Sequence, residues 1–578
     1  MLALFLLLTW NSLSAQTDSL YLSIDSSSVV FRRPDLKAIG NLSNGLKWDL
    51  SQGSGLPGLF GSDNPIRNAM LLPGIQTNMD LDSGLHIYGC DSMHSEISIN
   101  GVPVYGVGRL FGLFSPFNTD HFGSMRLQST ADGSNRIGGV LRLDNKTTLP
   151  QTISGIVNLG LMSLQTSISA PIGKKSALTV SARKSLLEEI YGKKIKLEDM
   201  PVQYGFHDVN ISFLSRPTSS DEILLDAFAS SDHYSMNNGY FLDGDMHLTW
   251  RNGYAALHWN HIFNETKLEQ TIYHTQYTNF GDLNMLGMNM VLPSSIQTDA
   301  YRTTYKRSEL IAYLDVAHHK ADVQVPVVTG GYHTFSMEDD SPEKRQMSLE
   351  STLSAKWKHY LTFNWTVTPK LDIQSYKAAG EKLKIGISPA LTISYNPDNK
   401  SNLSVSYALK RQYLFQSGIS DIGLPLEFWF LAGKDNKPQY SHNLNLSYDK
   451  SLAHGGWSLS TNLYYRSLHH QIEYFGSFLE LLNIDYAPMD RMYHGNGINY
   501  GVNGRLSKEQ GKFTCWMSYS LGRSLRRFNA ISNKVFPANH ERIHELDAYA
   551  NYQIDKWSFS SSLSKYRYNC IAEHHGSC

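Results

Sequence analysis

One short stretch of the sequence has the residue spacing of a zinc-dependent hydrolase. HERIH, His540 to His544, matches the pattern H-E-x-x-H, in which a helix presents two histidines to zinc and the glutamate activates a water molecule. The following residues, HELDAYANYQI, alternate apolar and polar and so predict a strand. In a strand neighbouring side chains point to opposite faces, and no plausible third carboxylate ligand follows before Glu573. We therefore assign no catalytic, cofactor or metal-binding role to these residues, and a zinc-dependent hydrolase remains an alternative.

Other residue types capable of metal chemistry are also poorly placed for it. Adjacent histidines of a strand point in opposite directions and chelate poorly, which predicts exposed residues at a sheet rim. Cysteines without a short regular spacing are expected to be isolated thiols. The histidine pairs are His318-His319, His469-His470 and His574-His575, and the cysteines are Cys90, Cys515, Cys570 and Cys578.

The composition favours a β protein and excludes one class of partner. The 578 residues include 51 Lys+Arg against 52 Asp+Glu, and a formal net charge of −1 argues against nucleic acid as a partner. The chain has 32 Tyr, 24 Phe, 10 Trp and 44 Gly but only 4 Cys. Such a chain is expected to be held together by strand pairing rather than by disulfides.

From Gly155 onward, alternating segments predict about 19 strands, many of them 10 to 15 residues long. Tyr and Trp recur near the strand ends, as in the aromatic girdles of outer-membrane barrels. A soluble sandwich could also alternate, but it would not sort its links by length. Here short links such as PIGKK, HHKADV and TVTPK alternate with long polar links at residues 186–204, 231–244, 279–306, 416–440, 475–494 and 526–540. We therefore predict a mainly β fold, a large antiparallel transmembrane β-barrel in contact with the lipid of a Gram-negative outer membrane.

The segments before the strands are different in character. Residues 1–15 have the apolar run and small residues of a signal peptide, and residues 16–40 are polar and predicted to be flexible. Residues 41–150 predict a compact α/β module. In it Asn64 caps a short helix that begins at Pro65 and stops at Pro73-Gly74. Turns with positive φ are expected at Gly84, Gly89, Gly101, Gly106, Gly112, Gly123, Gly133, Gly138 and Gly139.

This module resembles the plug domain of TonB-dependent outer-membrane receptors. NPIRNAMLLPGIQTNMDLDSGLHIYG, ISINGVPVYGVGRLFGLFSPFNTDHFGSMRLQS and RIGGVLRLDNK are similar to consecutive motifs of that plug, with YGC in place of the usual RGG and NG in place of DG. The resemblance implies an α/β plug, residues 41–150, inside the lumen of a barrel formed by residues 151–578. The residues that match the plug motifs are Pro73, Gly74, Asn100, Gly101, Pro103, Tyr105, Phe111, Gly112, Phe114, Ser115, Phe117, Asn118, Asp120, Gly138 and Gly139.

The resemblance also implies active uptake of an extracellular ligand, such as an iron chelate, a glycan, a peptide or cobalamin. The periplasmic TonB protein would supply the energy. An extended segment suits contact by strand addition, and the candidate residues are Leu20, Tyr21, Leu22, Ser23 and Ile24. The alternative within the same fold class is a passive porin or an adhesion barrel whose plug is only structural.

The end of the sequence departs from the expected pattern. The family's barrels have 22 strands, so about three strands are expected beyond those present. The tail NCIAEHHGSC does not alternate and holds two of the four cysteines. We expect a frameshift or a truncated gene near Tyr568.

Overall fold

The computed structural model describes residues 20–23, 29–31, 45–50, 64–76, 84–109, 112, 114–128, 134–192, 196–197, 200–238, 244–285, 288–323, 327–330, 345–419, 426–452, 456–474, 491–554 and 557–568. The predicted signal peptide, Ile24, Phe111, Gly133, Cys570, Cys578 and the pair His574-His575 lie outside these residues. Among the described residues, no helix has both the length and the apolar character that crossing a membrane requires.

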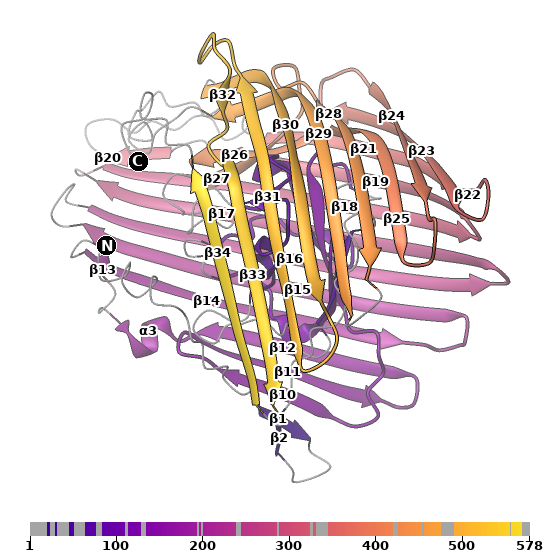
Figure 1. Ribbon diagram of the computed structural model, residues 1–578. Helices are drawn as coiled ribbons and strands as arrows, with labels where there is room; N and C mark the ends of the chain where they lie inside the picture. The colour runs from indigo at the N-terminus through magenta and orange to yellow at the C-terminus, as the bar shows by residue number, and fades with distance from the viewer. Residues whose placement is uncertain are drawn as a thin grey trace.

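One large antiparallel sheet dominates the molecule and curves around an inner unit (Figure 1). Nineteen strands of the described part pair in succession, each antiparallel to the next. They are β10 (Ser154–Leu159), β11 (Ser163–Ile172), β12 (Ser176–Ser185), β14 (Met200–Ser215), β15 (Asp221–Asn238), β16 (Gly244–Phe263), β17 (Thr266–Met285), β18 (Met288–Arg307), β19 (Leu310–Asp322), β21 (Arg345–Trp357), β23 (Trp365–Ala378), β24 (Lys384–Tyr395), β25 (Ser401–Gln412), β28 (Gln439–Ser451), β29 (Trp457–Tyr474), β30 (Met492–Lys508), β31 (Phe513–Arg527), β33 (Arg542–Ile554) and β34 (Trp557–Tyr568). The predicted number of strands is confirmed.

Shorter elements join or flank this sheet. They are β13 (Lys196–Leu197), β20 (Val327–Gly330), β22 (His359–Tyr360), β32 (Phe536–Pro537) and the helix α3 (Leu187–Ile190). A separate hairpin of β26 (Leu414–Ile419) and β27 (Leu426–Leu431) packs Phe415, Phe428 and Phe430 into an apolar cluster with Tyr376.

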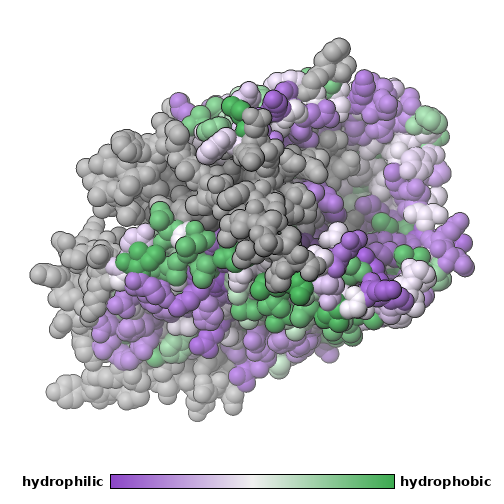
Figure 2. All heavy atoms as spheres, turned by 90° about the horizontal axis from the view of Figure 1, so that it is seen from below, coloured by the Kyte–Doolittle hydropathy of each residue, from purple (hydrophilic) through white to green (hydrophobic). Residues whose placement is uncertain are grey.

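The curved sheet is apolar outside and polar inside. In β21, Leu349 and Leu353 are 50% and 55% exposed, whereas Ser348 and Thr352 are buried. A soluble sheet would bury the leucines, so this alternation is that of a barrel wall in lipid. On the face seen in Figure 2, hydrophobic patches lie beside hydrophilic ones.

The links between neighbouring strands differ in length at the two ends of the wall. At the short-link end β16 and β17 are joined by residues 264–265, and β18 and β19 by residues 308–309. At the long-link end β25 and β28 are separated by residues 413–438, and β31 and β33 by residues 528–541. This is the sorting of links that the sequence predicted.

Four individual link predictions are wrong, wholly or in large part. Residues 231–238 of the predicted link 231–244 belong to β15. Residues 279–306 lie almost entirely in β17 and β18, which pair along their whole lengths. HHKADV falls largely within β19, and TVTPK within β23. Strands that extend beyond the lipid meet water on both faces, so polarity alone does not distinguish them from loops.

The inner unit, called the plug here, comprises the elements between Leu46 and Asn145. Its five-stranded sheet has the order β3 (Leu46–Asp49), β8 (Phe122–Gln128), β9 (Gly139–Asn145), β6 (Ser95–Ile99), β7 (Val102–Pro103). β6 and β9 are parallel, and the other pairs are antiparallel. A second pair, β4 (Ile75–Gln76) and β5 (His86–Ile87), lies beside the helix α2 (Pro65–Met70), and two short 3-10 helices are η1 (Ser92–His94) and η3 (Thr119–His121).

Local sequence explains the start of α2 and the β6–β7 turn. The Oδ1 atom of Asn64 accepts hydrogen bonds from the amides of Ile66 (3.0 Å) and Arg67 (3.2 Å), which confirms the predicted cap. Asn100 and Gly101 both have positive φ, 50° and 85°, as a two-residue hairpin turn requires.

The predicted positive φ holds for only some of the plug glycines. Gly89, Gly101, Gly106 and Gly112 have it, whereas Gly84, Gly123, Gly138 and Gly139 do not. The last two are required by close packing instead. A Cβ on Gly138 would lie 2.7 Å from the carbonyl oxygen of His94, and one on Gly139 would lie 2.7 Å from Ile87 Cδ1.

The first described segment lies at an edge of the large sheet. β1 (Leu20–Ser23) pairs antiparallel with β10 and with β2 (Val29–Phe31). The segment is extended, as expected for strand addition, and here its partner is the chain's own first wall strand.

Candidate functional site

The plug contacts the wall through charged and hydrogen-bonding groups and through aromatic pairs such as Trp48 with Trp516. Arg109 of the plug is 1% exposed and lies between two carboxylates of the wall. Its Nη1 is 2.8 Å from Asp208 Oδ2, and its Nε is 2.9 Å from Asp232 Oδ1. Arg183 shares Asp208 at 2.9 Å, and both guanidinium groups lie over the ring of Phe206. Pairing of this kind is what permits such charges to be buried.

The run Phe114 to Asp120, singled out from the sequence, follows this ion-pair cluster along the wall. The carbonyl of Ser115 accepts hydrogen bonds from Arg109 and Arg183. The Nδ2 of Asn118 donates to the carbonyl of Thr166 (3.2 Å), and Asp120 accepts from the Nδ2 of Asn158 (2.6 Å). Phe114 and Phe117 are buried, Phe117 completely.

The turn from Asn100 to Tyr105 meets a different part of the wall. Asn100 Nδ2 donates to Asp226 Oδ2 (2.6 Å), and the carbonyl of Pro103 accepts from Thr275 Oγ1 (2.8 Å). The hydroxyl of Tyr105 lies 2.7 Å from that of Thr298. Burial raises the pKa of Tyr105 to about 12, so its hydroxyl stays protonated.

Two further motif residues, Gly74 and Gly138, form hydrogen bonds with the wall. The amide of Gly74, next to Pro73, donates to Ser520 Oγ at 2.9 Å. The carbonyl of Gly138 accepts from Nη1 of Arg466 at 2.8 Å. Gly112 contacts the plug itself, because its carbonyl accepts from Arg67 Nε at 3.1 Å. That these motif residues take part in transport is a prediction.

HERIH does not form a zinc-hydrolase site. His540 precedes β33 and is 3% exposed, whereas His544 lies in β33, is exposed, and meets the hydroxyl of Tyr519 at 2.8 Å. The Oε2 atom of Glu541 accepts from the Ser524 amide (2.7 Å) and from Arg523 Nε (3.1 Å). Glu541 therefore connects the link before β33 to β31, and His540 and His544 do not lie together at one site.

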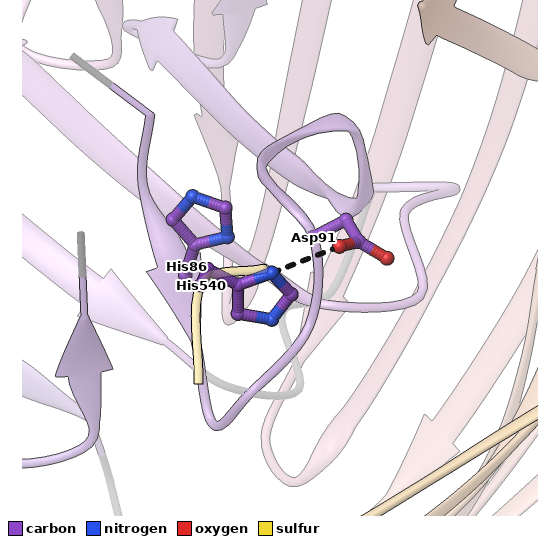
Figure 3. Close-up of side chains that lie close together, drawn as sticks. All are labelled: His86, Asp91 and His540. Carbon is purple, nitrogen blue, oxygen red and sulfur yellow. Dashed lines mark ion pairs between the residues drawn. The ribbon is translucent and has the colours of Figure 1, made fainter. Parts of the chain in front are cut away.

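His540 instead meets two plug residues that sequence reasoning missed. His540 Nδ1 is 3.0 Å from Asp91 Oδ1, and its ring stacks on that of His86 with centroids 4.2 Å apart (Figure 3). One ligand atom from each of these three side chains lies within 4.8 Å of the others. Only the wrapping of the wall around the plug brings them together, and no local pattern in the sequence signals it.

Two charged or polar neighbours complete this cluster. Arg526 Nη2 is 3.2 Å from Asp91 Oδ2. The Asp91 amide donates to His94 Nδ1 (3.1 Å), and His94 Nε2 therefore donates to Gln439 Oε1 (3.0 Å). Burial lowers the pKa of His94 to about 4, which agrees with this neutral tautomer. Although burial raises the pKa of Asp91, Arg526 and His540 outweigh it and hold that pKa well below the usual value.

A cationic surface lies at the long-link end of the wall. A hollow of about 560 Å³, called the rim hollow here, is lined by Glu381, Lys382, Lys384, Arg411, Gly433, Lys434, Lys437, Pro438, Tyr440 and His470. Its only acidic residue, Glu381, is paired with Lys384 at 2.7 Å. Five positive side chains thus face one carboxylate, an arrangement that favours an anionic ligand.

The histidine pairs are only partly at the surface. His319 is buried, with Nδ1 2.8 Å from Thr298 Oγ1, so the prediction that it is an exposed rim residue is wrong. It lies on the inward face of β19, which alternation alone did not assign. His469 and His470 are half-buried, and a bulge between Leu468 and Gln471 interrupts the pairing of β29 with β30 there. Cys90 and Cys515 are free thiols.

Comparison with known proteins finds matches among solved structures but not among family models or curated sequences. No family model matches the sequence, and no curated protein matches it. Among solved structures, the ferric preacinetobactin receptor BauA of Acinetobacter baumannii is 11% identical, with a TM-score of 0.62 over 90% of this chain and 85% of that chain. The alcaligin outer-membrane receptor FauA of Bordetella pertussis is 10% identical, with a TM-score of 0.58 over 96% and 92%. The siderophore receptor PirA of Pseudomonas aeruginosa is 11% identical, with a TM-score of 0.57 over 87% and 88%.

The chain has the fold of a TonB-dependent receptor. The fold class predicted from the sequence is thereby confirmed. The receptor fold also explains why polar side chains of the plug meet polar side chains of the wall, since most of the wall's large exposed apolar side chains lie on its outer, lipid-facing side.

Proposed function

We propose that this chain is a Gram-negative outer-membrane receptor that takes up an anionic ligand actively, with energy from the periplasmic TonB protein. The observation that carries the proposal is the set of polar contacts between the plug and the wall. Hydrogen bonds and ion pairs such as Arg109 with Asp208 and Asp232 can be exchanged for water when the plug moves.

The rim hollow supports an anionic ligand. It lies at the long-link end, which faces the outside in outer-membrane barrels. The similar structures are described as receptors for siderophores and as transporters of ferric citrate or iron. Among the classes left open by the sequence, an anionic iron chelate therefore fits best, ahead of glycans, peptides and cobalamin.

The assignment of parts follows from the same proposal. Residues 41–150 act as the plug, residues 151–578 as the barrel, and residues 1–15 as the export signal. The segment from Leu20 to Ile24 is the proposed TonB contact. In this structure β1 pairs with β10, so binding of TonB by strand addition would have to exchange one backbone partner for another.

Uptake of radioactive iron tests this function. Cells that carry the chain as their only receptor are supplied with ferric citrate or ferric catecholates, with and without a protonophore. Uptake that stops with the protonophore supports a TonB-coupled receptor. Uptake that continues supports the passive porin, and the absence of uptake for every anionic chelate contradicts the proposal.

Charge reversal tests the rim hollow separately. Lys434→Glu with Lys437→Glu should lower ligand affinity by at least about tenfold, because two attractive charges become repulsive. Lys400→Glu, an exposed lysine in a short link, is the matched control and should leave affinity unchanged. Equal affinity in both variants would exclude the rim hollow as the ligand site.

A further inference from the structure

The cluster of His86, Asp91 and His540 has a feature that hydrogen bonding within the protein does not explain well. His540 Nε2 is 2.9 Å from the carbonyl oxygen of Gly89, and its Nδ1 is 3.0 Å from a carboxylate oxygen of Asp91. A carbonyl oxygen and a carboxylate oxygen only accept. A neutral imidazole has one N–H, so it can donate to only one of these two oxygens. At the other contact a nitrogen lone pair faces an oxygen lone pair, unless a second proton or a metal ion is bound there.

The two neutral tautomers of His540 differ in which of these contacts is a hydrogen bond. If Nε2 donates to Gly89, the lone pair of Nδ1 points at Asp91 Oδ1. The ring of His86 lies against that of His540 (Figure 3). Its Nδ1 is 3.1 Å from the carbonyl oxygen of Cys90 and donates to it, so that a metal would bind Nε2, or would bind Nδ1 in place of this hydrogen bond. Two imidazoles and a carboxylate thus converge, with His86 6% and His540 3% exposed.

We propose that His86, Asp91 and His540 bind a divalent first-row transition metal ion such as Zn²⁺, through His540 Nδ1, Asp91 Oδ1 and a ring nitrogen of His86. Two nitrogens and one carboxylate oxygen are a common ligand set for these ions. The three ligands are not among the residues that line the rim hollow, so binding of Zn²⁺ can be measured without any uptake assay.

The surroundings are those of a supported metal site. A histidine that binds metal usually donates its other N–H to a carbonyl or carboxylate, and a ligating carboxylate is itself hydrogen-bonded. Here the carbonyl of Gly89 holds His540, and Arg526 holds the second oxygen of Asp91 at 3.2 Å. Arg526 lowers the affinity for a cation but fixes the direction of the carboxylate.

The distances between the ligand atoms allow one metal ion to bind after a small movement of the side chains. Ligand atoms about 2.0–2.1 Å from one ion lie about 3–3.5 Å apart. The His540–Asp91 pair already meets this at 3.0 Å, and all three ligand atoms lie within 4.8 Å of one another. The rings of His86 and His540 are stacked at 19°, so His86 must turn about its Cβ–Cγ bond to direct its nitrogen at the ion.

Such an ion would link the plug to the wall. His86 and Asp91 belong to the plug, whereas His540 belongs to the link between β31 and β33. Bound metal is therefore expected to stabilise the plug in its position within the wall and to slow its movement.

Zinc binding to the refolded full-length chain in detergent tests the proposal. After removal of metal with a chelator, titration with Zn²⁺ alone should show one site, and Co²⁺ should give a visible absorption spectrum. His86→Ala, Asp91→Asn and His540→Gln should each weaken Zn²⁺ binding by more than about 100-fold, beyond the loss usual for a supporting residue.

His544→Ala is the matched control, because it removes the other histidine of HERIH and should leave binding unchanged. Thermal midpoints measured with and without Zn²⁺ separate binding from folding. The metal should raise the midpoint of the wild-type chain and of His544→Ala, but not of the three ligand variants. A wild-type chain that binds no Zn²⁺, or ligand variants that bind it as tightly, would overturn the proposal and leave a protonated His540–Asp91 pair.

Discussion

At the scale of single residues, we expect Arg109 to contribute more than other charged residues of the plug to the stability of the plug within the wall. Arg109→Ala would leave Asp232 buried without its cation and weaken the charge balance at Asp208. We expect a loss of about 3–5 kcal/mol, because an unpaired buried charge is costly. The measurement is thermal unfolding of the folded protein in detergent, together with single-channel conductance.

A second arginine of the plug provides the comparison. Arg142 pairs with Asp144 at 2.6 Å, but its side chain is 42% exposed. Arg142→Ala should cost less than about 1 kcal/mol, since solvent screens exposed pairs. If both variants lose the same stability, the Arg109 cluster is not the main anchor.

His121 makes the plug sensitive to acid. Burial, with a smaller effect of Lys146, lowers its pKa to about 3, and its Nδ1 lies 2.8 Å from Ser181 Oγ. Below pH 6.5 the unfolded chain takes up a proton that the folded chain refuses until pH falls to about 3. Stability should therefore fall as pH falls through this window, by up to about 1.4 kcal/mol per pH unit.

The variant His121→Gln isolates this contribution. It keeps a hydrogen-bonding group toward Ser181 but cannot titrate. Denaturant unfolding at pH 7 and pH 4.5 should show a smaller loss for the variant than for the wild type. Identical losses would mean that other groups account for the acid sensitivity.

Local structure in the plug could be predicted from the sequence, whereas the cluster of His86, Asp91 and His540 could not. Asn64 and the Asn100-Gly101 turn depend on neighbours in sequence, and the predictions for them are confirmed. His86, Asp91 and His540 come together only because the wall curves around the plug. Such contacts depend on the register of strands hundreds of residues apart, for which no local signal exists.

At the scale of elements, the turn around Gly106 shows why the plug needs particular glycines. Gly106 has φ +58°, and a Cβ there would lie 2.2 Å from Tyr277 of the wall. Gly106→Ala should displace this turn and cost more than about 2 kcal/mol, combining backbone strain with overpacking. Increased trypsin cleavage within the plug and a lower melting temperature are the expected observations.

Gly173 separates strain from overpacking. It also has positive φ, +67°, but a Cβ would meet nothing within 4 Å. Gly173→Ala should therefore cost only about 1 kcal/mol of backbone strain and leave the plug resistant to trypsin. Equal effects of the two substitutions would show that contact with Tyr277 does not matter.

Strand number was predictable at this scale because each strand carries its own alternation, as β21 does. The ends of strands were not. In β17 and β18 polar residues continue the pairing beyond the apolar part, and hydrophobic patterning cannot distinguish such strands from loops. The outward leucines of β21 and its inward serine and threonine also had to be assigned to a side by the structure.

At the scale of the whole molecule, the plug is what fills the space within the wall. Deletion of residues 41–150 should leave a wall that conducts ions, because polar side chains line its inner face. Conductance in planar bilayers should rise from near zero to that of an open pore. A closed, non-conducting protein after the deletion would contradict the assignment of these residues as a plug.

The polar lining of the wall also determines how permeability would change if the plug moved. Hydroxyl, amide and guanidinium groups such as those of Ser181, Asn210 and Arg183 hold water readily, so the parts of the described wall that carry them would be wetted as soon as the plug left them. Any partial displacement would immediately create a continuous aqueous path. A cell with a loosened plug should therefore admit large antibiotics that the outer membrane normally excludes, well before the plug has left the lumen.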